Sequence, residues 1–125
     1  MTLLFDSDVL IDLLRGKQKT GIEVEKLIEQ ADEILCSVIT VAEILAGMRE
    51  DELEATEGLL KDLIKVEATE EIARLAGDMK RKTISHKLSL DDCLIAASAL
   101  QAKAQLVTKN AKHYPFKGLN VHAIR

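Results

Sequence analysis

The opening segment, residues 3–16 (LLFDSDVLIDLLRG), limits what this chain can fold into more than any other feature. Asp6, Asp8 and Asp12 stand in an otherwise apolar stretch, although burying an unpaired carboxylate is strongly unfavourable. The run is short and continuously apolar up to the first acid, which predicts a buried strand over residues 2–6. The carboxylates must therefore have a structural or chemical reason for their position.

A helix is expected directly after this strand. It should start near Ser7 or Asp8, either of which could cap it, and end at Gly16, because glycine favours the C-terminal end of a helix. Asp8 and Asp12 are four residues apart, so they share one helix face, which we interpret as solvent-exposed. Asp6 then has no obvious structural role.

Apolar strand-like and helix-like segments alternate along the rest of the chain, which implies a parallel sheet with helices on both faces. The sequence thus predicts an α/β fold, a sandwich around a mostly parallel sheet of four to five strands. A loop is expected after residue 83. Further strands are predicted at 34–39, 65–68, 105–109 and 119–124, and helices at 21–31, 40–48, 50–64, 70–83 and 90–104. The predicted inward residues of the helices at 21–31 and 50–64 include Ile22, Leu27, Ile28, Ala31, Leu53, Leu59, Leu60, Leu63 and Ile64.

Length and composition favour one globular domain over residues 1–125. The formal charge of −4 argues against a purely electrostatic nucleic-acid binder, but not against a nuclease whose metal ions offset its acids. Cys36 and Cys93 share no metal-ligand spacing and are interpreted as buried free thiols. No transmembrane or signal-peptide pattern is found, so no membrane association and a cytoplasmic location are expected.

Acidic and polar residues follow three of the predicted strands. Asp6 ends the first strand, Glu43 lies one helical turn beyond the second, and Asn110 follows the strand at 105–109. Ligands of open parallel sheets bind outside the carboxyl ends of the strands, so these side chains should meet at one edge. Asp92 and its neighbour, at the start of the helix over 90–104, could reach the same edge.

Two of these acids also have a purely structural interpretation. Thr40 and Glu43 have the spacing of a capping box, and Ser89 and Asp92 have nearly the same form. Acidic residues in the first turn also interact favourably with the helix dipole. The convergence of these acids at one edge favours a metal site over a purely structural role. Clustered carboxylates raise one another's pKa, and a hard divalent cation removes that penalty.

Four blocks of the chain, in this order, resemble a known family: LLFDSDVLIDLLRG, SVITVAEILAGMR, LSLDDCLIAASAL and LVTKNAKHYPFKGLNV. They are similar to the PIN-domain ribonucleases of the VapC type, the toxins of type II toxin–antitoxin modules. In the third block the family's acid stands three residues before Ile-Ala-Ala, which selects Asp92 over Asp91.

The resemblance implies a PIN-like three-layer sandwich and Mg²⁺ or Mn²⁺ bound by the catalytic residues Asp6, Glu43 and Asp92. It also implies endonucleolytic cleavage of RNA by a metal-activated water, homodimerisation, and inhibition by a cognate antitoxin protein.

The fourth block departs from the family pattern, because many relatives carry a further acid at or near Asn110 or His113. Asn110 can still offer an oxygen or hold a water, and Thr108 could donate to a phosphate or simply end its strand. On the basis of this resemblance, three basic residues near the same edge are predicted to contact RNA phosphates: Arg15, Lys109 and Lys112.

Two alternatives remain at this stage. Asp6 and Asp8 have the Asp-x-Asp spacing of haloacid-dehalogenase phosphatases, with Asp6 as nucleophile and Asp8 as acid/base. The chain could also be a catalytically degenerate protein-binding module, since the fourth acid is missing.

Overall fold

Five parallel strands form one sheet in the order β3-β2-β1-β4-β5 within residues 1–83 and 88–125, the part of the chain that the computed structural model describes. The predicted loop after residue 83 falls mainly on residues 84–87, which lie outside the described residues. The strands are β1 (Thr2–Phe5), β2 (Glu33–Ser37), β3 (Ile64–Val66), β4 (Gln105–Thr108) and β5 (Val121–Ala123). The α-helices are α1 (Ser7–Leu14), α2 (Gln18–Gln30), α3 (Val38–Gly47), α4 (Leu53–Lys61), α5 (Glu70–Lys82) and α6 (Leu90–Gln101), with 3-10 turns η1 (Glu50–Glu52) and η2 (Ala111–His113).

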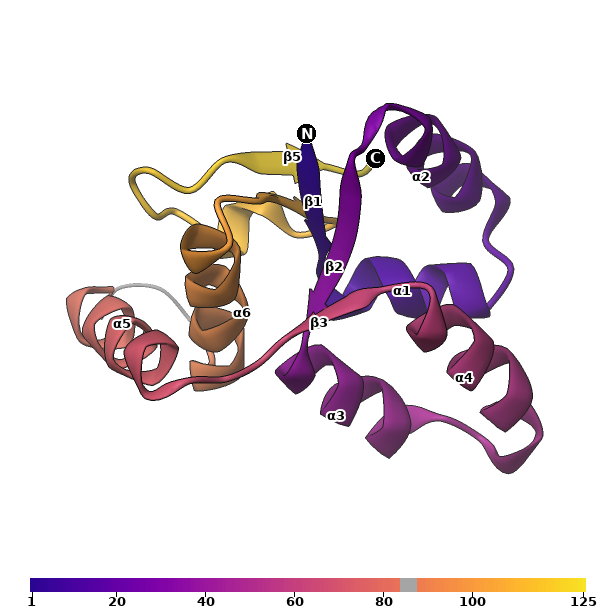
Figure 1. Cartoon of the computed structure of the whole chain (residues 1–125), viewed down its shortest axis with the longest axis horizontal. Coiled ribbons are helices and arrows are strands. Elements are labelled where there is room, and N and C mark those ends of the chain that lie inside the picture. The colour runs from indigo at the N-terminus through magenta and orange to yellow at the C-terminus, as the bar shows by residue number, and fades with distance from the viewer. Residues whose placement is uncertain (84–87) are drawn as a thin grey trace.

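Successive residues of the central strand β1 enter two different hydrophobic cores, which explains its unbroken apolar run. Leu4 belongs to the core under α5 and α6, whereas Leu3 and Phe5 belong to the core shared with α1, α2, α3 and α4. Figure 1 shows the sheet edge-on, with α5 and α6 on one side and α1, α2 and α4 on the other. Both faces of the sheet are therefore covered, and the predicted three-layer α/β sandwich is confirmed.

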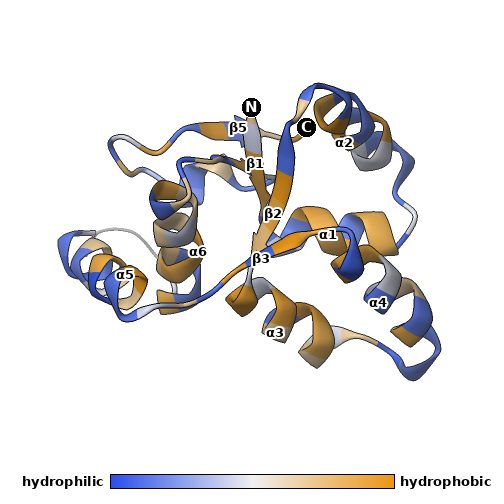
Figure 2. Ribbon diagram, in the orientation of Figure 1, coloured by the Kyte–Doolittle hydropathy of each residue, from blue (hydrophilic) through white to orange (hydrophobic). Residues whose placement is uncertain are grey.

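The helices turn apolar residues toward the sheet and polar residues outward (Figure 2). On α5, the residues Ile72, Ala76 and Met79 are buried and follow the helical period, while most of the other positions are exposed. The small residues of α6, Ala96, Ala97 and Ala99, are fully buried and let this helix lie close to the sheet. Among the described helices, none combines the length and the apolar character needed to cross a bilayer.

The chain leaves β1 toward β2 on one side of the sheet, and the neighbour on the other side, β4, is reached only later. Such a reversal of strand order opens a crevice outside the carboxyl ends of the strands. The backbone N–H of Asp6, the residue after β1, donates to the Val107 carbonyl of β4 at 2.9 Å. Asp6 is therefore fixed at the mouth of this crevice.

The caps of α1 and α3 differ from the sequence predictions. Asp6 itself caps α1, because its Oδ1 accepts from the Ser7 N–H, so neither Ser7 nor Asp8 does so. The predicted strand over 34–39 ends at Ser37, whose side chain caps α3. Since α3 begins at Val38, the capping box predicted from Thr40 and Glu43 is wrong, and Glu43 lies in the second turn of the helix.

The predicted buried face of α2 is only half correct. Ile22 is 57% exposed and Ile28 40% exposed, whereas Thr20 and Val24 are buried. The helix starts at Gln18, before the expected position, and packs along the stripe that runs from Thr20 through Val24 toward the partly buried Leu27 and Ala31. A stripe in this register leaves Ile22 and Ile28 outside the contact.

The predicted helix over 50–64 is also shorter than expected. It divides into η1 and α4 and ends at Lys61, and Ile64 instead begins the edge strand β3 with 49% of its surface exposed. Leu60 and Leu63 are buried as predicted, whereas Leu53, which was also predicted to face inward, is 49% exposed at the start of α4. Cys36 and Cys93 are buried free thiols as predicted. Burial raises the pKa of the Cys36 thiol to about 11, so this thiol stays protonated.

One hydroxyl group in the core under α4 lacks a hydrogen-bond partner. Thr56 is fully buried, and its Oγ1 is unpaired among the described residues. The residue lines a small, mainly apolar cavity with Ile11, Ile44 and Met48. A buried hydroxyl without a partner destabilises the folded state.

We therefore predict that Thr56→Val raises the free energy of unfolding by about 1 kcal/mol, because valine keeps the shape and removes the unpaired hydroxyl. Urea denaturation followed by circular dichroism measures this change. The matched control is Thr69→Val, which removes the hydroxyl that caps α5 by accepting from the Ile72 N–H at 3.2 Å. This control should lose about 1 kcal/mol. A Thr56→Val protein less stable than wild type would contradict the prediction.

Candidate functional site

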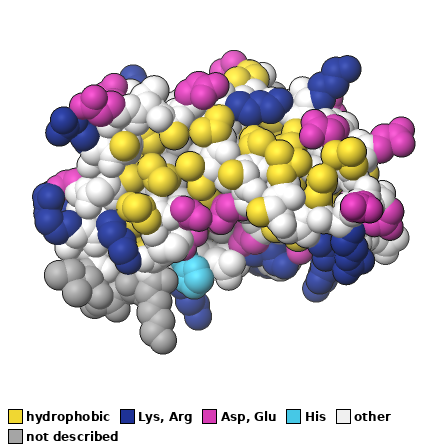
Figure 3. All heavy atoms as spheres, turned by 90° about the horizontal axis from the view of Figure 1, so that it is seen from below, with side chains coloured by type: hydrophobic (Ala, Val, Ile, Leu, Met, Phe, Trp, Pro, Cys, Tyr) yellow, Lys and Arg dark blue, Asp and Glu magenta, His cyan; other side chains and the backbone are white. Residues whose placement is uncertain are grey.

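Four carboxylates line one cavity of about 240 Å³ at the carboxyl edge of the sheet. Asp6 comes from the β1–α1 junction, Asp8 from α1, Glu43 from α3 and Asp92 from α6. Figure 3, viewed from this edge, shows acidic side chains gathered between two hydrophobic areas. The structure thus brings together Asp6, Glu43 and Asp92, as the sequence predicts, and Asn110 and His113 line the same cavity.

Asp6 is held rigidly by three donors. Its Oδ1 accepts from the Ser7 N–H at 2.8 Å, and its Oδ2 accepts from the hydroxyls of Thr108 at 2.8 Å and Tyr114 at 2.9 Å. Only 6% of the residue is exposed. Burial raises the pKa of Asp6, these donors lower it in part, and the charge of Asp92 raises it further. Thr108, at the end of β4, therefore supports the site by fixing Asp6.

Glu43 is held by a hydroxyl from another element. The Ser7 Oγ lies 2.6 Å from Glu43 Oε1, to which it donates, and 3.0 Å from the buried hydroxyl of Thr40. Partial burial raises the pKa of Glu43, as do the charges of Asp91, Asp6 and Asp92 to a smaller degree. Because Glu43 caps no helix, its carboxylate is available to the cavity.

Asp92 combines both of the roles that the sequence allows. Its backbone N–H donates to Ser89 Oγ at 3.1 Å and its Oδ2 accepts from the Ser89 N–H at 3.4 Å, so the predicted capping box is confirmed. Its other oxygen, Oδ1, lies 3.4 Å from the Tyr114 hydroxyl in the cavity. Asp91 is exposed and does not line the cavity, in agreement with the choice of Asp92.

The structure corrects the prediction that Asp8 is a solvent-exposed helix residue. It lines the cavity, and its Oδ2 accepts from the Asn110 side-chain amide at 2.8 Å and from the Lys109 N–H at 3.2 Å. Burial and the charge of Asp6 raise the pKa of Asp8 to about 6. The local sequence does not show this contact, because it depends on the pairing of β1 with β4, which places the loop after β4 over the first turn of α1.

Asp12 is likewise not on a solvated face. It is 7% exposed, and its Oδ2 accepts from Thr20 Oγ1 at 2.8 Å and pairs with Lys109 Nζ at 2.7 Å. Burial alone would raise the pKa of Asp12, but Lys109 and Thr20 lower it. The packing of α2 on α1 decides this burial, and spacing within α1 alone does not contain that information.

The predicted RNA-contacting residues have different surroundings. Lys109 is paired with Asp12, Arg15 pairs with Glu52 at 3.1 Å between its Nε and the carboxylate, and Lys112 is exposed in η2 next to the cavity residue His113. Their contact with RNA stays a prediction.

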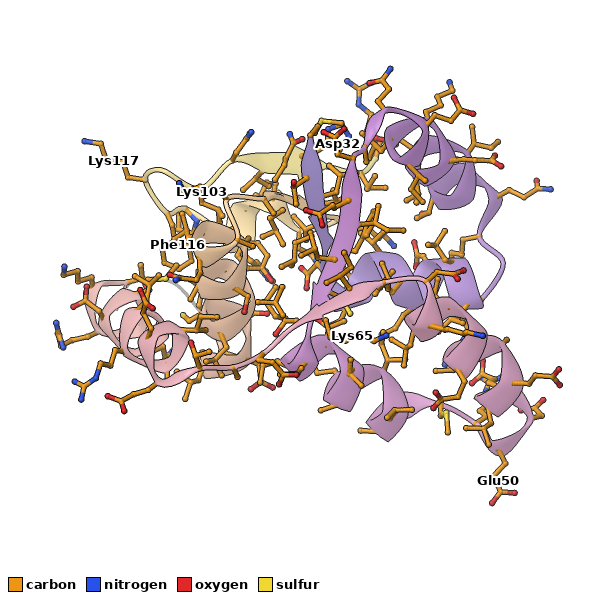
Figure 4. The ribbon with its side chains drawn as sticks, in the orientation of Figure 1. Asp32, Glu50, Lys65, Lys103, Phe116 and Lys117 are labelled. Atoms are coloured by element: carbon orange, nitrogen blue, oxygen red, sulfur yellow. The ribbon has the colours of Figure 1, made fainter. Side chains whose placement is uncertain are left out.

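Tyr114 is the site residue that the sequence analysis did not identify. It is 4% exposed, and its hydroxyl reaches both Asp6 and Asp92. The loop that carries it packs against α6 through the nearby Phe116, labelled in Figure 4. A tyrosine after a 3-10 turn has no sequence pattern that indicates such a contact, since the turn itself depends on where the loop crosses α6.

The chemistry of the donor set suits a hard divalent cation, because carboxylate oxygens and an amide oxygen are the ligands that Mg²⁺ prefers. Burial, and to a smaller degree the charges of neighbouring acids, raises the pKa values of Asp6, Asp8 and Glu43, so positive charge in this cavity would be favourable. Among residues 1–83 and 88–125, however, no three Asp, Glu, His or Cys side chains lie in a ready-made ligating arrangement. Several of the carboxylate oxygens point instead to hydroxyl donors.

Comparison with known proteins gives a consistent result. The family model of the PIN domain matches residues 3–118. The chain is 37% identical over 114 residues to Ribonuclease VapC19 of Mycobacterium tuberculosis, covering 90% of this chain and 91% of that protein. In fold it is similar to VapBC2 from Rickettsia felis bound to a promoter DNA fragment, with a TM-score of 0.85, 19% identity and full coverage of both chains. It is also similar to a toxin–antitoxin complex from Klebsiella pneumoniae, with a TM-score of 0.82, 24% identity and 98% coverage of both chains.

The electrostatics of the site predict that the protein loses stability as the pH rises from about 4 to 7 in the presence of a chelator. The pKa of Asp8 is raised from 3.8 to about 6, so the folded state binds this proton more tightly than the unfolded chain does. The resulting stabilisation is complete below the unfolded-state pKa and is lost as the pH rises through the folded-state pKa.

Asp8→Asn should flatten this decline by about 1–2 kcal/mol, as measured by urea denaturation across the pH range. The control Asp78→Asn should leave the slope between pH 4 and 7 unchanged, because the hydrogen bond from Lys82 lowers the pKa of Asp78 and places its titration below this window. An Asp8→Asn protein with the wild-type slope would rule out this assignment.

Proposed function

The chain belongs to the PIN-domain family, and on that premise we propose that it is an Mg²⁺- or Mn²⁺-dependent endoribonuclease, the toxin of a type II toxin–antitoxin pair. The observation that carries the proposal is the position of Asp6, Glu43 and Asp92 on one cavity at the carboxyl edge of the sheet. Three acids from three separate elements meet where the fold opens a ligand crevice. The curated relative VapC19 is named a ribonuclease.

Asp6, Glu43 and Asp92 would hold the cation. A bound divalent cation would supply the positive charge that lowers the pKa of an attacking water and offsets the charge of the phosphodiester oxygens. The protein contributes orientation: Ser7 N–H and Thr108 fix Asp6 between β1 and β4. The Ser7 hydroxyl orients Glu43 across the cavity. The buried apolar strands behind these groups keep them from relaxing away from one another.

Asn110 stands where many relatives are expected to have a fourth acid. Its amide nitrogen donates to Asp8 at 2.8 Å, which orients its oxygen and anchors the loop after β4 to α1. We assign it a supporting role in holding this loop at the site. The RNA phosphates would meet Lys112 and, at some loss of their present ion pairs, Lys109 and Arg15.

A cognate antitoxin and a second copy of the chain are the partners that we propose. The solved relatives of the same fold include a toxin–antitoxin complex. Large apolar side chains are also exposed on several helices, and Figure 3 shows hydrophobic areas on both sides of the acidic cluster. Within residues 1–83 and 88–125, and apart from the edge-strand residue Ile64 and Met1, the exposed large apolar residues are Ile22 and Ile28 on α2, Leu45 on α3, Leu53 on α4 and Leu90 on α6.

The structure does not favour the alternative of a haloacid-dehalogenase-like phosphatase. That reaction would use Asp6 as a nucleophile, but all three acceptor contacts of Asp6 tie it to Ser7, Thr108 and Tyr114 within the site. The acidic pair Asp91–Asp92 opens the helix α6 and does not follow a strand. The convergence of all three predicted acids on one cavity argues against the degenerate-module alternative.

We predict that Asp6→Asn abolishes RNA cleavage while the protein stays folded, because asparagine keeps a cap acceptor but removes the charge of the central ligand. The measurement is release of fragments from total RNA with Mg²⁺, with and without a chelator, alongside circular dichroism. Asp51→Asn, an exposed position on η1, is the matched control and should cleave as wild type does. Cleavage at the wild-type rate by Asp6→Asn, or insensitivity of the wild type to the chelator, would contradict the proposal.

A pair of substitutions in α3 separates catalysis from helix stability. Glu43→Gln should lose activity and keep its stability within about 0.5 kcal/mol, because Glu43 caps no helix. Ser37→Ala should lose about 1 kcal/mol of stability, since the Ser37 side chain accepts from Ile39 N–H at 3.0 Å, and it should keep its activity. The two readouts are urea denaturation and RNA cleavage. Retained activity in Glu43→Gln would mean that Glu43 is not a ligand.

A further inference from the structure

Tyr114 occupies an unusual position for a neutral side chain, between two carboxylates. Its ring lies in the core under α6, and its hydroxyl emerges into the acidic cavity. The hydroxyl donates to Asp6 Oδ2 at 2.9 Å and lies 3.4 Å from Asp92 Oδ1. These two acids are 86 residues apart in the sequence and belong to different elements, so Tyr114 is a bridge between two sides of the site.

The number of hydrogen bonds that the Asp6 carboxylate can accept determines how this bridge would affect a bound cation. A carboxylate oxygen offers about two lone-pair sites. The Oδ2 of Asp6 already accepts from Thr108 and Tyr114, whereas among the described residues Oδ1 accepts from the Ser7 N–H alone. A cation that takes Oδ2 must therefore displace one of the two hydroxyls.

Tyr114 is the hydroxyl that a cation would displace. Thr108 sits on the strand β4, and its Oγ1 also accepts from the Asn110 N–H at 3.0 Å, which locks its orientation. Tyr114, in contrast, follows η2 in a loop, and its hydroxyl donates to Asp6 from there. The phenol donates its O–H to Asp6 Oδ2, so Tyr114 acts here as a hydrogen-bond donor rather than as an anionic ligand.

We propose that the Tyr114 hydroxyl competes with a divalent cation for the Asp6 and Asp92 carboxylates and so weakens the hold of the site on the cation. This inference rests on the proposed metal-dependent function and adds a regulating residue to it. The phenol O–H supplies partial positive charge at the place where a cation supplies its full charge. Tyr114 is thus a positioning residue that acts on the metal ligands.

The test compares Mn²⁺ binding by wild type, Tyr114→Phe and Thr56→Val in isothermal titration calorimetry. Tyr114→Phe keeps the buried ring and removes the competing donor, so we expect about tenfold tighter Mn²⁺ binding, given the strength of a hydrogen bond to a charged group. Thr56→Val removes a hydroxyl in the core that does not line the acidic cavity, so this variant should bind Mn²⁺ as wild type does. Equal or weaker Mn²⁺ binding by a folded Tyr114→Phe protein would overturn the proposal, because it would show that Tyr114 only supports the structure.

A spectroscopic readout is available because Tyr114 is the only tyrosine and the chain has no tryptophan. Tb³⁺, a hard cation that binds carboxylates, emits when an aromatic donor close to it is excited. We expect tyrosine-sensitised emission from wild type that Mn²⁺ suppresses and that Asp6→Asn lacks. Calorimetric Tb³⁺ binding without sensitised emission would place the ion away from Tyr114 and overturn the proposal.

The failure of this inference can be told apart from that of the proposed function. If neither wild type nor Tyr114→Phe binds Mn²⁺, the metal-dependent function itself is wrong, and the inference fails with it. If both bind with the same affinity, the site holds metal and only the competition by Tyr114 is refuted. Mn²⁺ binding by Tyr114→Phe alone would support the competition in its strongest form.

Discussion

The structure depends on how several negative charges are held together at the buried end of a parallel sheet. Asp6 directly follows a strand that is covered on both faces, so its carboxylate cannot relax into solvent. The hydroxyls of Thr108, Tyr114 and Ser7 reduce the penalty of burying these carboxylates without removing it, and the pKa values of Asp6 and Glu43 stay raised, mainly by burial. A fold that accepts this electrostatic penalty has a site prepared for positive charge.

Helix capping and chemistry share the same residues at this edge. Asp6 caps α1 through Oδ1 and points Oδ2 into the cavity, and Asp92 caps α6 through Oδ2 and points Oδ1 toward Tyr114. A carboxylate has two oxygens, so one can satisfy a helix terminus while the other serves the site. The capping interpretation of these acids is therefore confirmed, and it leaves the second oxygen of each available for the proposed function.

Sequence patterns predicted the layers well and the contacts between helices poorly. The unbroken apolar run of β1 and the alternation of strands and helices were sufficient for a parallel sheet covered on both faces. For α2, the pattern contained more apolar residues than the helix buries, so Ile22 and Ile28 were assigned to the wrong face. Only the register of α2 against α1, which buries Thr20 beside Asp12, decides which stripe faces inward.

The sequence by itself determined the fold class and the strand edge at which Asp6 and Glu43 meet, because both follow from local periodicity and from the geometry of parallel strands. The choice of Asp92 over Asp91 came from the resemblance to the family. Only the tertiary structure decided that Asp8 and Asp12 are held in polar networks, that Glu43 caps nothing, and that Tyr114 bridges two acids. The contacts of Asp8 and Tyr114 arise where the loop after β4 crosses α1 and α6. Such contacts join residues about a hundred positions apart, and no local pattern records them.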